Sequence, residues 1–129
     1  MKLEWNDSYC IGDERIDGQH RHLFELANVS IQASNLSEFR LAAIQLYRYI
    51  RIHFADEEDI MRRAQFVGYY AHLKMHDSLL LQFNAICQRI GQGQLDNDAI
   101  RNFMTEWLLV HIVQQDRQIA AYIQKIKDQ

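Results

Sequence analysis

The chain has 129 residues, of which 48% are hydrophobic, and this length and composition suit one domain with one buried core. The formal net charge is -3 with acids and bases interspersed, so no basic stripe is present and we expect no nucleic-acid partner. No apolar run approaches the length of a membrane span, and early acids replace a secretory signal, so we expect a cytoplasmic protein with no membrane partner.

The first 16 residues lack a helical period. Trp5, Tyr9 and Ile11 alternate with polar residues, which is typical of an extended segment lying on a core. We therefore expect an N-terminal arm over residues 1–16, followed by the first helix.

Apolar residues recur at helical spacing through the rest of the chain, which contains no proline. The predicted helices cover about 17–34, 37–64, 69–90 and 96–126. Asp17 and Ser37 are suited to cap the first two of them. Short connections make neighbouring helices antiparallel, so the predicted fold class is all-α, an up-down-up-down four-helix bundle with residues 1–129 as a single domain.

Seven polar residues fall near one level of this predicted bundle. They are His20, His53, Glu57, His72, His76, His111 and Asp116. At about 1.5 Å per residue, four of the histidines lie within roughly 3 Å of one height, and the other three residues lie about one turn further on. Pairs four residues apart share a helix face, and these faces are otherwise apolar. Because buried imidazoles and carboxylates are costly unless they are paired or metal-bound, the set predicts a metal site.

The step from His111 to Asp116 does not suit a regular helix. Five residues turn about 500° along an ideal α-helix, which leaves the two side chains some 140° apart. We therefore predict a π-type distortion between Trp107 and Asp116, a feature often found at functional sites. By contrast, His22 points about 160° away from His20, and we expect it on the surface or rim.

The ligand types and their number narrow the kind of centre. Imidazole and carboxylate without thiolate suit iron, manganese, zinc or copper. Seven ligands exceed the needs of one ion, so two ions are expected. If Glu57, Asp116 and one solvent-derived oxygen bridge them, five histidines divide as three and two, and one ion keeps an open position.

Several motifs resemble the hemerythrin family, in particular its bacterial members. The matching stretches are Trp5…Tyr9-x-Ile11-Gly12, Ile16-Asp17-Gly18-Gln19-His20-x-x-Leu23-Phe24, His53-Phe54-x-x-Glu57-Glu58-x-x-Met61, His72-x-x-x-His76 and Trp107-Leu108-x-x-His111-Ile112-x-x-x-Asp116. The resemblance covers nearly the whole chain. One departure is Phe66-Val67, where the family often has Tyr-Pro before the third helix.

The resemblance implies two non-haem iron ions, bridged by Glu57, Asp116 and an oxo or hydroxo group, that bind dioxygen reversibly. It places one iron, without an open coordination position, on His72, His76 and His111. The other iron, which has an open position, is placed on His20 and His53. The implied partner is dioxygen, and the implied role is that of an oxygen carrier, store or supplier.

Two other functions are compatible with the same site. One is an oxygen or redox sensor that acts on an attached output domain or a protein partner. The other is a di-iron enzyme that reduces peroxide or nitric oxide. No residue stands out as a general acid, base or nucleophile beside the open position, so we expect no enzyme. Apolar side chains near the ligands are expected to exclude water; the candidates are Phe24, Ile50, Phe54, Trp107, Leu108 and Ile112.

Overall fold

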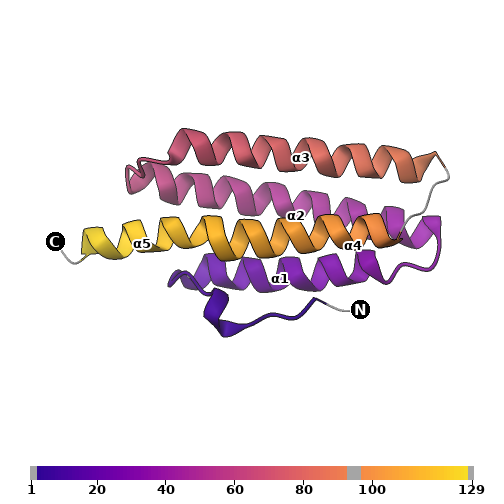
Figure 1. Ribbon diagram of the computed structural model, residues 1–129, viewed down its shortest axis with the longest axis horizontal. Coiled ribbons are helices and arrows are strands. Elements are labelled where there is room, and N and C mark those ends of the chain that lie inside the picture. The colour runs from indigo at the N-terminus through magenta and orange to yellow at the C-terminus, as the bar shows by residue number, and fades with distance from the viewer. Residues whose placement is uncertain (1–2, 93–96, 128–129) are drawn as a thin grey trace.

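Long helical rods account for most of the computed structural model, which describes residues 3–92 and 97–127 (Figure 1). The first three rods are single α-helices. These are α1 (Glu14–Ile31), α2 (Leu36–Arg63) and α3 (Tyr69–Gly91). The fourth rod is made of three consecutive segments. These are α4 (Asn97–Thr105), the π-helix η2 (Glu106–Gln115) and α5 (Asp116–Lys127). No strand occurs in the described part of the chain.

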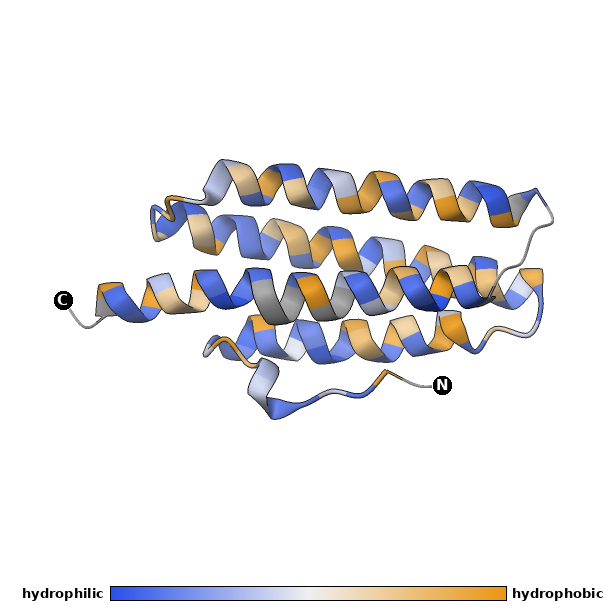
Figure 2. Cartoon of the chain, viewed as in Figure 1, coloured by the Kyte–Doolittle hydropathy of each residue, from blue (hydrophilic) through white to orange (hydrophobic). Residues whose placement is uncertain are grey.

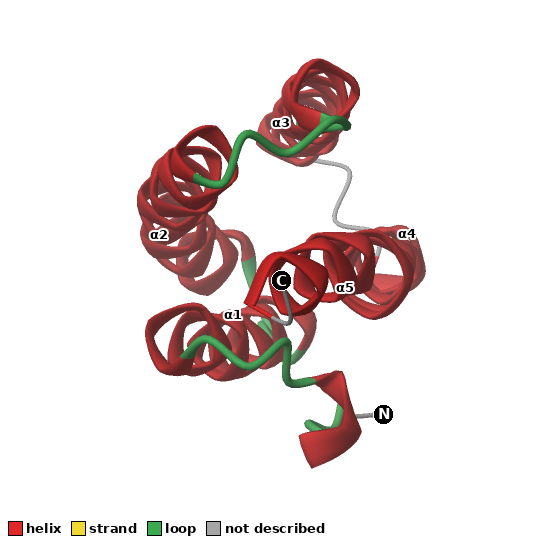
Figure 3. Ribbon diagram, turned by 90° about the vertical axis from the view of Figure 1, so that its left-hand side faces the viewer, coloured by secondary structure: helices red, strands yellow, loops and turns green. Residues whose placement is uncertain are grey.

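Successive rods run in opposite directions, as Figure 1 shows, and so form an up-down-up-down bundle. Viewed from one end, α1, α2, α3 and the fourth rod stand around a common centre (Figure 3). Each rod contacts its two neighbours in this ring, including α1 with α4. The predicted all-α four-helix bundle is therefore confirmed.

The first two helices begin earlier than predicted, and both predicted caps were wrong. Asp13 caps α1, because its side chain accepts the backbone N–H of Ile16. Asn35 caps α2 in the same way through the N–H of Glu38. Asp17 lies instead within α1, and Ser37 within α2. In addition, α1 ends at Ile31 and not at about residue 34.

Asp17 ties the N-terminal arm to α1. Its carboxylate accepts the backbone N–H of Ile11 at 2.7 Å and that of Gly12 at 3.3 Å, and the residue is buried. Gly12 has a φ of 92°, a conformation that glycine adopts without strain. The arm thus turns into α1 around a charged acceptor that belongs to the helix itself.

The rest of the arm lies along the bundle as expected. Leu3 and Asn28 exchange two hydrogen bonds of 2.8 Å. Trp5 and Tyr9 pack against the core, and both rings lie within 5.9 Å of the ring of Phe24. The arm includes one turn of 3-10 helix, Asp7–Tyr9.

The core follows the apolar stripe of each helix. Figure 2 shows hydrophobic and hydrophilic residues alternating around every rod. Leu23 and Leu46 are fully buried, and Phe39 and Ile100 nearly so. Burial of such side chains stabilises the fold by about 1.5–3 kcal/mol each. None of the helices in the described ranges has both the length and the apolar character needed to cross a membrane.

Asp17→Ala should lower the free energy of unfolding by about 1–2 kcal/mol, because two backbone N–H groups lose a charged acceptor. Urea titration of the metal-free protein measures this change. Glu4→Ala is the control: Glu4 is an exposed carboxylate of the same arm, and its loss should change stability by less than about 0.5 kcal/mol. Equal effects of the two substitutions would contradict the assigned role of Asp17.

Candidate metal centre

All seven residues singled out in the sequence meet in the middle of the bundle. None is more than 4% exposed. α1 supplies one residue, α2 and α3 supply two each, and the fourth rod supplies the last two. In that order they are His20, then His53 and Glu57, then His72 and His76, then His111 and Asp116.

The ligand atoms form two adjoining groups, in each of which all atoms lie within 4.8 Å of one another. The three-histidine group consists of Glu57, His72, His76 and His111. The two-histidine group consists of His20, His53, Glu57 and Asp116. Glu57 belongs to both, so the two groups share a carboxylate.

Glu57 divides its two oxygens between the groups. Its Oε1 lies 2.6 Å from Nε2 of His72 and 3.0 Å from Nε2 of His76. Its Oε2 lies 3.3 Å from Nε2 of His53 and 3.7 Å from Nε2 of His20. The carboxylate therefore lies across the boundary between the groups.

Asp116 divides its oxygens in the same way. Its Oδ1 lies 3.2 Å from Nε2 of His72 and 3.3 Å from Nε2 of His111, both in the three-histidine group. Its Oδ2 lies 3.0 Å from Nε2 of His20, in the two-histidine group. Two carboxylates thus face both groups with one oxygen each.

The π-helix η2 makes the second of these arrangements possible. It covers Glu106–Gln115, and the backbone N–H of Asp116 bonds to the carbonyl of His111, five residues earlier. An i to i+5 bond widens the helix, so that side chains five residues apart approach the same face. The predicted π-type distortion is confirmed, and it brings Nε2 of His111 to 3.3 Å from Oδ1 of Asp116.

Three histidines are oriented from outside by hydrogen bonds to their Nδ1 atoms. Nδ1 of His53 lies 3.0 Å from Oε1 of Gln19, and Nδ1 of His76 lies 2.8 Å from Oε2 of Glu58. These oxygens only accept, so each Nδ1–H donates and each Nε2 lone pair is left facing the site. Gln19 is held in turn by Asp56, whose Oδ2 accepts from its amide at 2.6 Å.

The third partner is a sulfur atom, because Nδ1 of His111 lies 3.4 Å from Sδ of Met75. Gln19 and Glu58 lie within the motifs quoted from the sequence, but no role was predicted for them or for Met75. A signal was present, since each of them is the sequence neighbour of a ligand. Each of the three contacts a histidine on the next rod, because a step of one residue along a helix turns the side chain by about 100° from that of the neighbouring ligand.

Several buried polar atoms of the site have no hydrogen bond within the described residues. They are Nδ1 of His20, Oε2 of Glu57, Nε2 of His111 and both oxygens of Asp116. Leaving such atoms without partners costs about 1–3 kcal/mol each. All but the first are ligand atoms of the two groups. Cations at this place would satisfy them, so the residues fit a metal centre with nitrogen and oxygen donors.

The charges of the site oppose the cost of burial. Burial alone would lower the pKa of His20, but the adjacent negative carboxylates of Asp116 and Glu57 raise that pKa to about 9. The pKa of His72 is raised to about 9 by the same carboxylates. Burial lowers the pKa of His53. Burial would raise the pKa of Glu57, but hydrogen bonds from the surrounding imidazoles hold it well below its usual value.

Aromatic side chains cover part of the site. The ring of Phe54 stacks on His76 with 3.7 Å between centroids, and it lies 5.8 Å from His111. Trp107 packs edge-on against Phe54 at 6.4 Å. Ile50 and Phe24 are buried, but Phe24 packs with the N-terminal arm. The side chains of Leu108 and Ile112, also expected in this wall, lie outside the described residues.

His22 lies apart from the cluster, as expected. Its side chain is 45% exposed, and its Nδ1 lies 3.3 Å from Oε2 of Glu25 one turn along α1. The sixth histidine therefore serves as a surface comparison for the five buried ones.

The fold and the site together define a four-helix-bundle protein whose centre carries two adjoining donor groups for cations. Residues 11–123 match the family described as Hemerythrin HHE cation binding domain. The chain belongs to this family.

Relatives and solved structures agree with this assignment. The bacteriohemerythrin of Clostridium acetobutylicum is 27% identical in an alignment that covers 88% of this chain and 95% of that protein. The bacteriohemerythrin of Pseudomonas paraeruginosa is 28% identical over 97% of this chain and 82% of its own length. A crystal structure of wild-type hemerythrin superimposes with a TM-score of 0.83 at 24% identity, covering 94% of this chain and 97% of that one. This last likeness shows the shared fold.

The metal-free protein should lose stability as the pH rises. His20 and His72 have folded pKa values of about 9 against a reference of 6.5. Their protonation therefore stabilises the fold fully below the reference value and is lost as the pH passes about 9. We expect the free energy of unfolding, from urea titrations, to fall by at least about 2 kcal/mol between about pH 7 and pH 10.

The metal-loaded protein is the control for this pH dependence. Its histidines bind as neutral ligands, so the decline should be much smaller. A metal-free stability that stays level or rises over this range would contradict protonation of the two histidines.

Proposed function

We propose that this chain binds dioxygen reversibly at a centre of two non-haem iron ions. The observation that carries the proposal is the placement of Glu57 and Asp116, each of which directs one oxygen to the three-histidine group and the other to the two-histidine group. A carboxylate placed in this way is suited to bridge two cations. Membership of the hemerythrin family and the resemblance of the motifs favour iron and dioxygen.

The two groups would hold the ions unequally. One ion would be held by His72, His76 and His111, and the other by His20 and His53. Glu57, Asp116 and an oxo or hydroxo group would bridge them. With the bridging ligands shared, the second ion would have one protein ligand fewer, which would leave a position for a small molecule. Iron bound there would supply the electrons that reversible dioxygen binding requires.

The chain's own residues hold the ligands in place and exclude water. Gln19 and Glu58 hold the rings of His53 and His76 with their Nε2 atoms directed inward. The ring of Phe54 covers His76. A dry, apolar wall keeps proton donors away from the bound gas, which favours its release as dioxygen. We therefore propose binding and release without chemical turnover, and no enzyme activity.

An optical titration tests the function. Protein loaded with iron(II) under argon should develop visible bands in air and lose them under vacuum, with about two iron ions per chain. Bands that form in air and persist under vacuum would contradict reversible binding. Rapid turnover of peroxide or nitric oxide with an electron donor would instead support an enzyme.

A pair of substitutions tests the ligand set. Glu57→Ala removes the residue that belongs to both groups, so the iron content after loading should fall from about two per chain to one or less. His22→Ala removes the exposed histidine and should leave the iron content unchanged. Equal iron content in the two variants, measured by metal analysis after desalting, would contradict the bridging role of Glu57.

A further inference from the structure

The outer partner of His111 differs in chemistry from those of His53 and His76. His53 donates to an amide oxygen and His76 to a carboxylate, but His111 faces the thioether sulfur of Met75 at 3.4 Å. A thioether is a weak acceptor and has no proton to donate, so Nδ1–H of His111 is the donor. Of these three acceptors, sulfur is the one that a mild oxidant converts to a different group.

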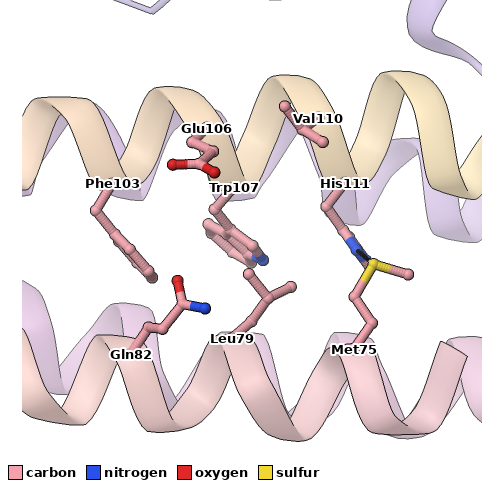
Figure 4. A pocket seen from close by; sticks show the side chains of 8 residues that line it. All are labelled: Met75, Leu79, Gln82, Phe103, Glu106, Trp107, Val110 and His111. Atoms are coloured by element: carbon pink, nitrogen blue, oxygen red, sulfur yellow. Dashed lines mark hydrogen bonds between the residues drawn. The ribbon is translucent and has the colours of Figure 1, made fainter. Parts of the chain in front are cut away.

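This contact lies in the wall of a cavity of about 100 Å³ between α3 and the fourth rod. Figure 4 shows the sulfur of Met75 facing the ring of His111 across the gap. Glu106 and Val110 also line the cavity and are exposed, and Met75 itself is half-buried. A molecule as small as hydrogen peroxide therefore has a route from solvent to the sulfur.

The other methionines of the described chain are not accessible in this way. Met61 is 0% and Met104 is 2% exposed. Met1 lies outside the described residues. Because oxidation of methionine follows exposure, Met75 is the methionine of the bundle that should react first.

The cavity also offers a second donor to a new oxygen atom. Nε1 of Trp107 is buried and has no hydrogen-bond partner within the described residues. Trp107 lines the same cavity as Met75 and His111 (Figure 4). The wall of this cavity therefore holds two N–H donors, and a hydrogen bond to such a donor would lower the cost of burying the polar sulfoxide.

We propose that Met75 is a positioning residue for the ligand His111 and a site of modification by hydrogen peroxide. In the reaction, the sulfur gives an electron pair to one peroxide oxygen, a sulfur–oxygen bond forms and the oxygen–oxygen bond breaks. The second oxygen leaves as water with both protons. The thioether is oxidised by two electrons to the sulfoxide, and the peroxide is reduced by the same two electrons.

The modification changes the environment of a metal ligand. A sulfoxide oxygen accepts a hydrogen bond more strongly than a thioether sulfur does, so it draws more strongly on Nδ1–H of His111. A stronger outer acceptor makes the imidazole a better donor to its metal. For this consequence the inference rests on the proposed iron centre, whereas the oxidation of Met75 does not depend on it.

Peroxide treatment of the diferric, iron-loaded protein tests the inference. After desalting, digestion and mass analysis, the peptide with Met75 should gain about 16 Da at least about tenfold faster than the peptides with Met61 and Met104. The visible absorption bands of the desalted protein should shift in proportion to the sulfoxide at Met75. Met75→Leu should abolish this response to peroxide, and Met104→Leu, a matched substitution in the core, should respond as the native chain does.

Three results would overturn the inference. The first is oxidation of Met75 no faster than that of the two buried methionines. The second is a sulfoxide at Met75 that leaves the bands unchanged, and the third is an equal shift in Met75→Leu. The mass readout separates this inference from the proposed function: a protein that fails to release dioxygen under vacuum can still oxidise at Met75, and a reversible oxygen binder can leave Met75 intact.

Discussion

The structure depends on burying five imidazoles and two carboxylates at one level of a helical bundle. Each group alone would cost several kcal/mol in an apolar core. Together they offset that cost, because Glu57 and Asp116 face Nε2 atoms on every rod. The same arrangement raises the pKa of His20 and lowers that of Glu57. In the metal-free protein, protonated histidine and ionised carboxylate therefore stabilise each other. Cations bound at this place would replace these protons, and folding would then be linked to metal binding.

The outer partners follow a regular pattern around the bundle. Gln19 on α1 orients a histidine on α2, Glu58 on α2 orients one on α3, and Met75 on α3 orients one on η2. Each partner is adjacent in sequence to a ligand on its own helix. A rotation or slide of one rod therefore moves a ligand and the partner of the next ligand together. The acceptors differ in strength, from carboxylate through amide to thioether, so the ligands are not equivalent donors.

Much of this was predictable because helix period and height are properties of local sequence. The four rods, the common level of His20 and His53 with the other ligands, and the π-type step all follow from residue spacing. The helix caps could not be predicted in this way. Asp17 is of a residue type that often caps helices, but its carboxylate accepts N–H groups of the N-terminal arm, which is a contact between separate segments. Met75 was missed for a similar reason, since its role is visible only once α3 faces η2.

The π-helix η2 contributes both to the set of buried polar residues and to the cavity beside Met75. A regular helix would turn Asp116 away from His111, and the buried carboxylate of Asp116 would then no longer face the three-histidine group. The wider π-helix places both side chains at the site, although its backbone geometry is less favourable than that of an α-helix. The cavity beside Met75 runs along this same segment, since Glu106, Trp107 and Val110 of its wall belong to η2. The distortion that completes the set of seven residues therefore also supplies part of the cavity wall beside the contact between His111 and Met75.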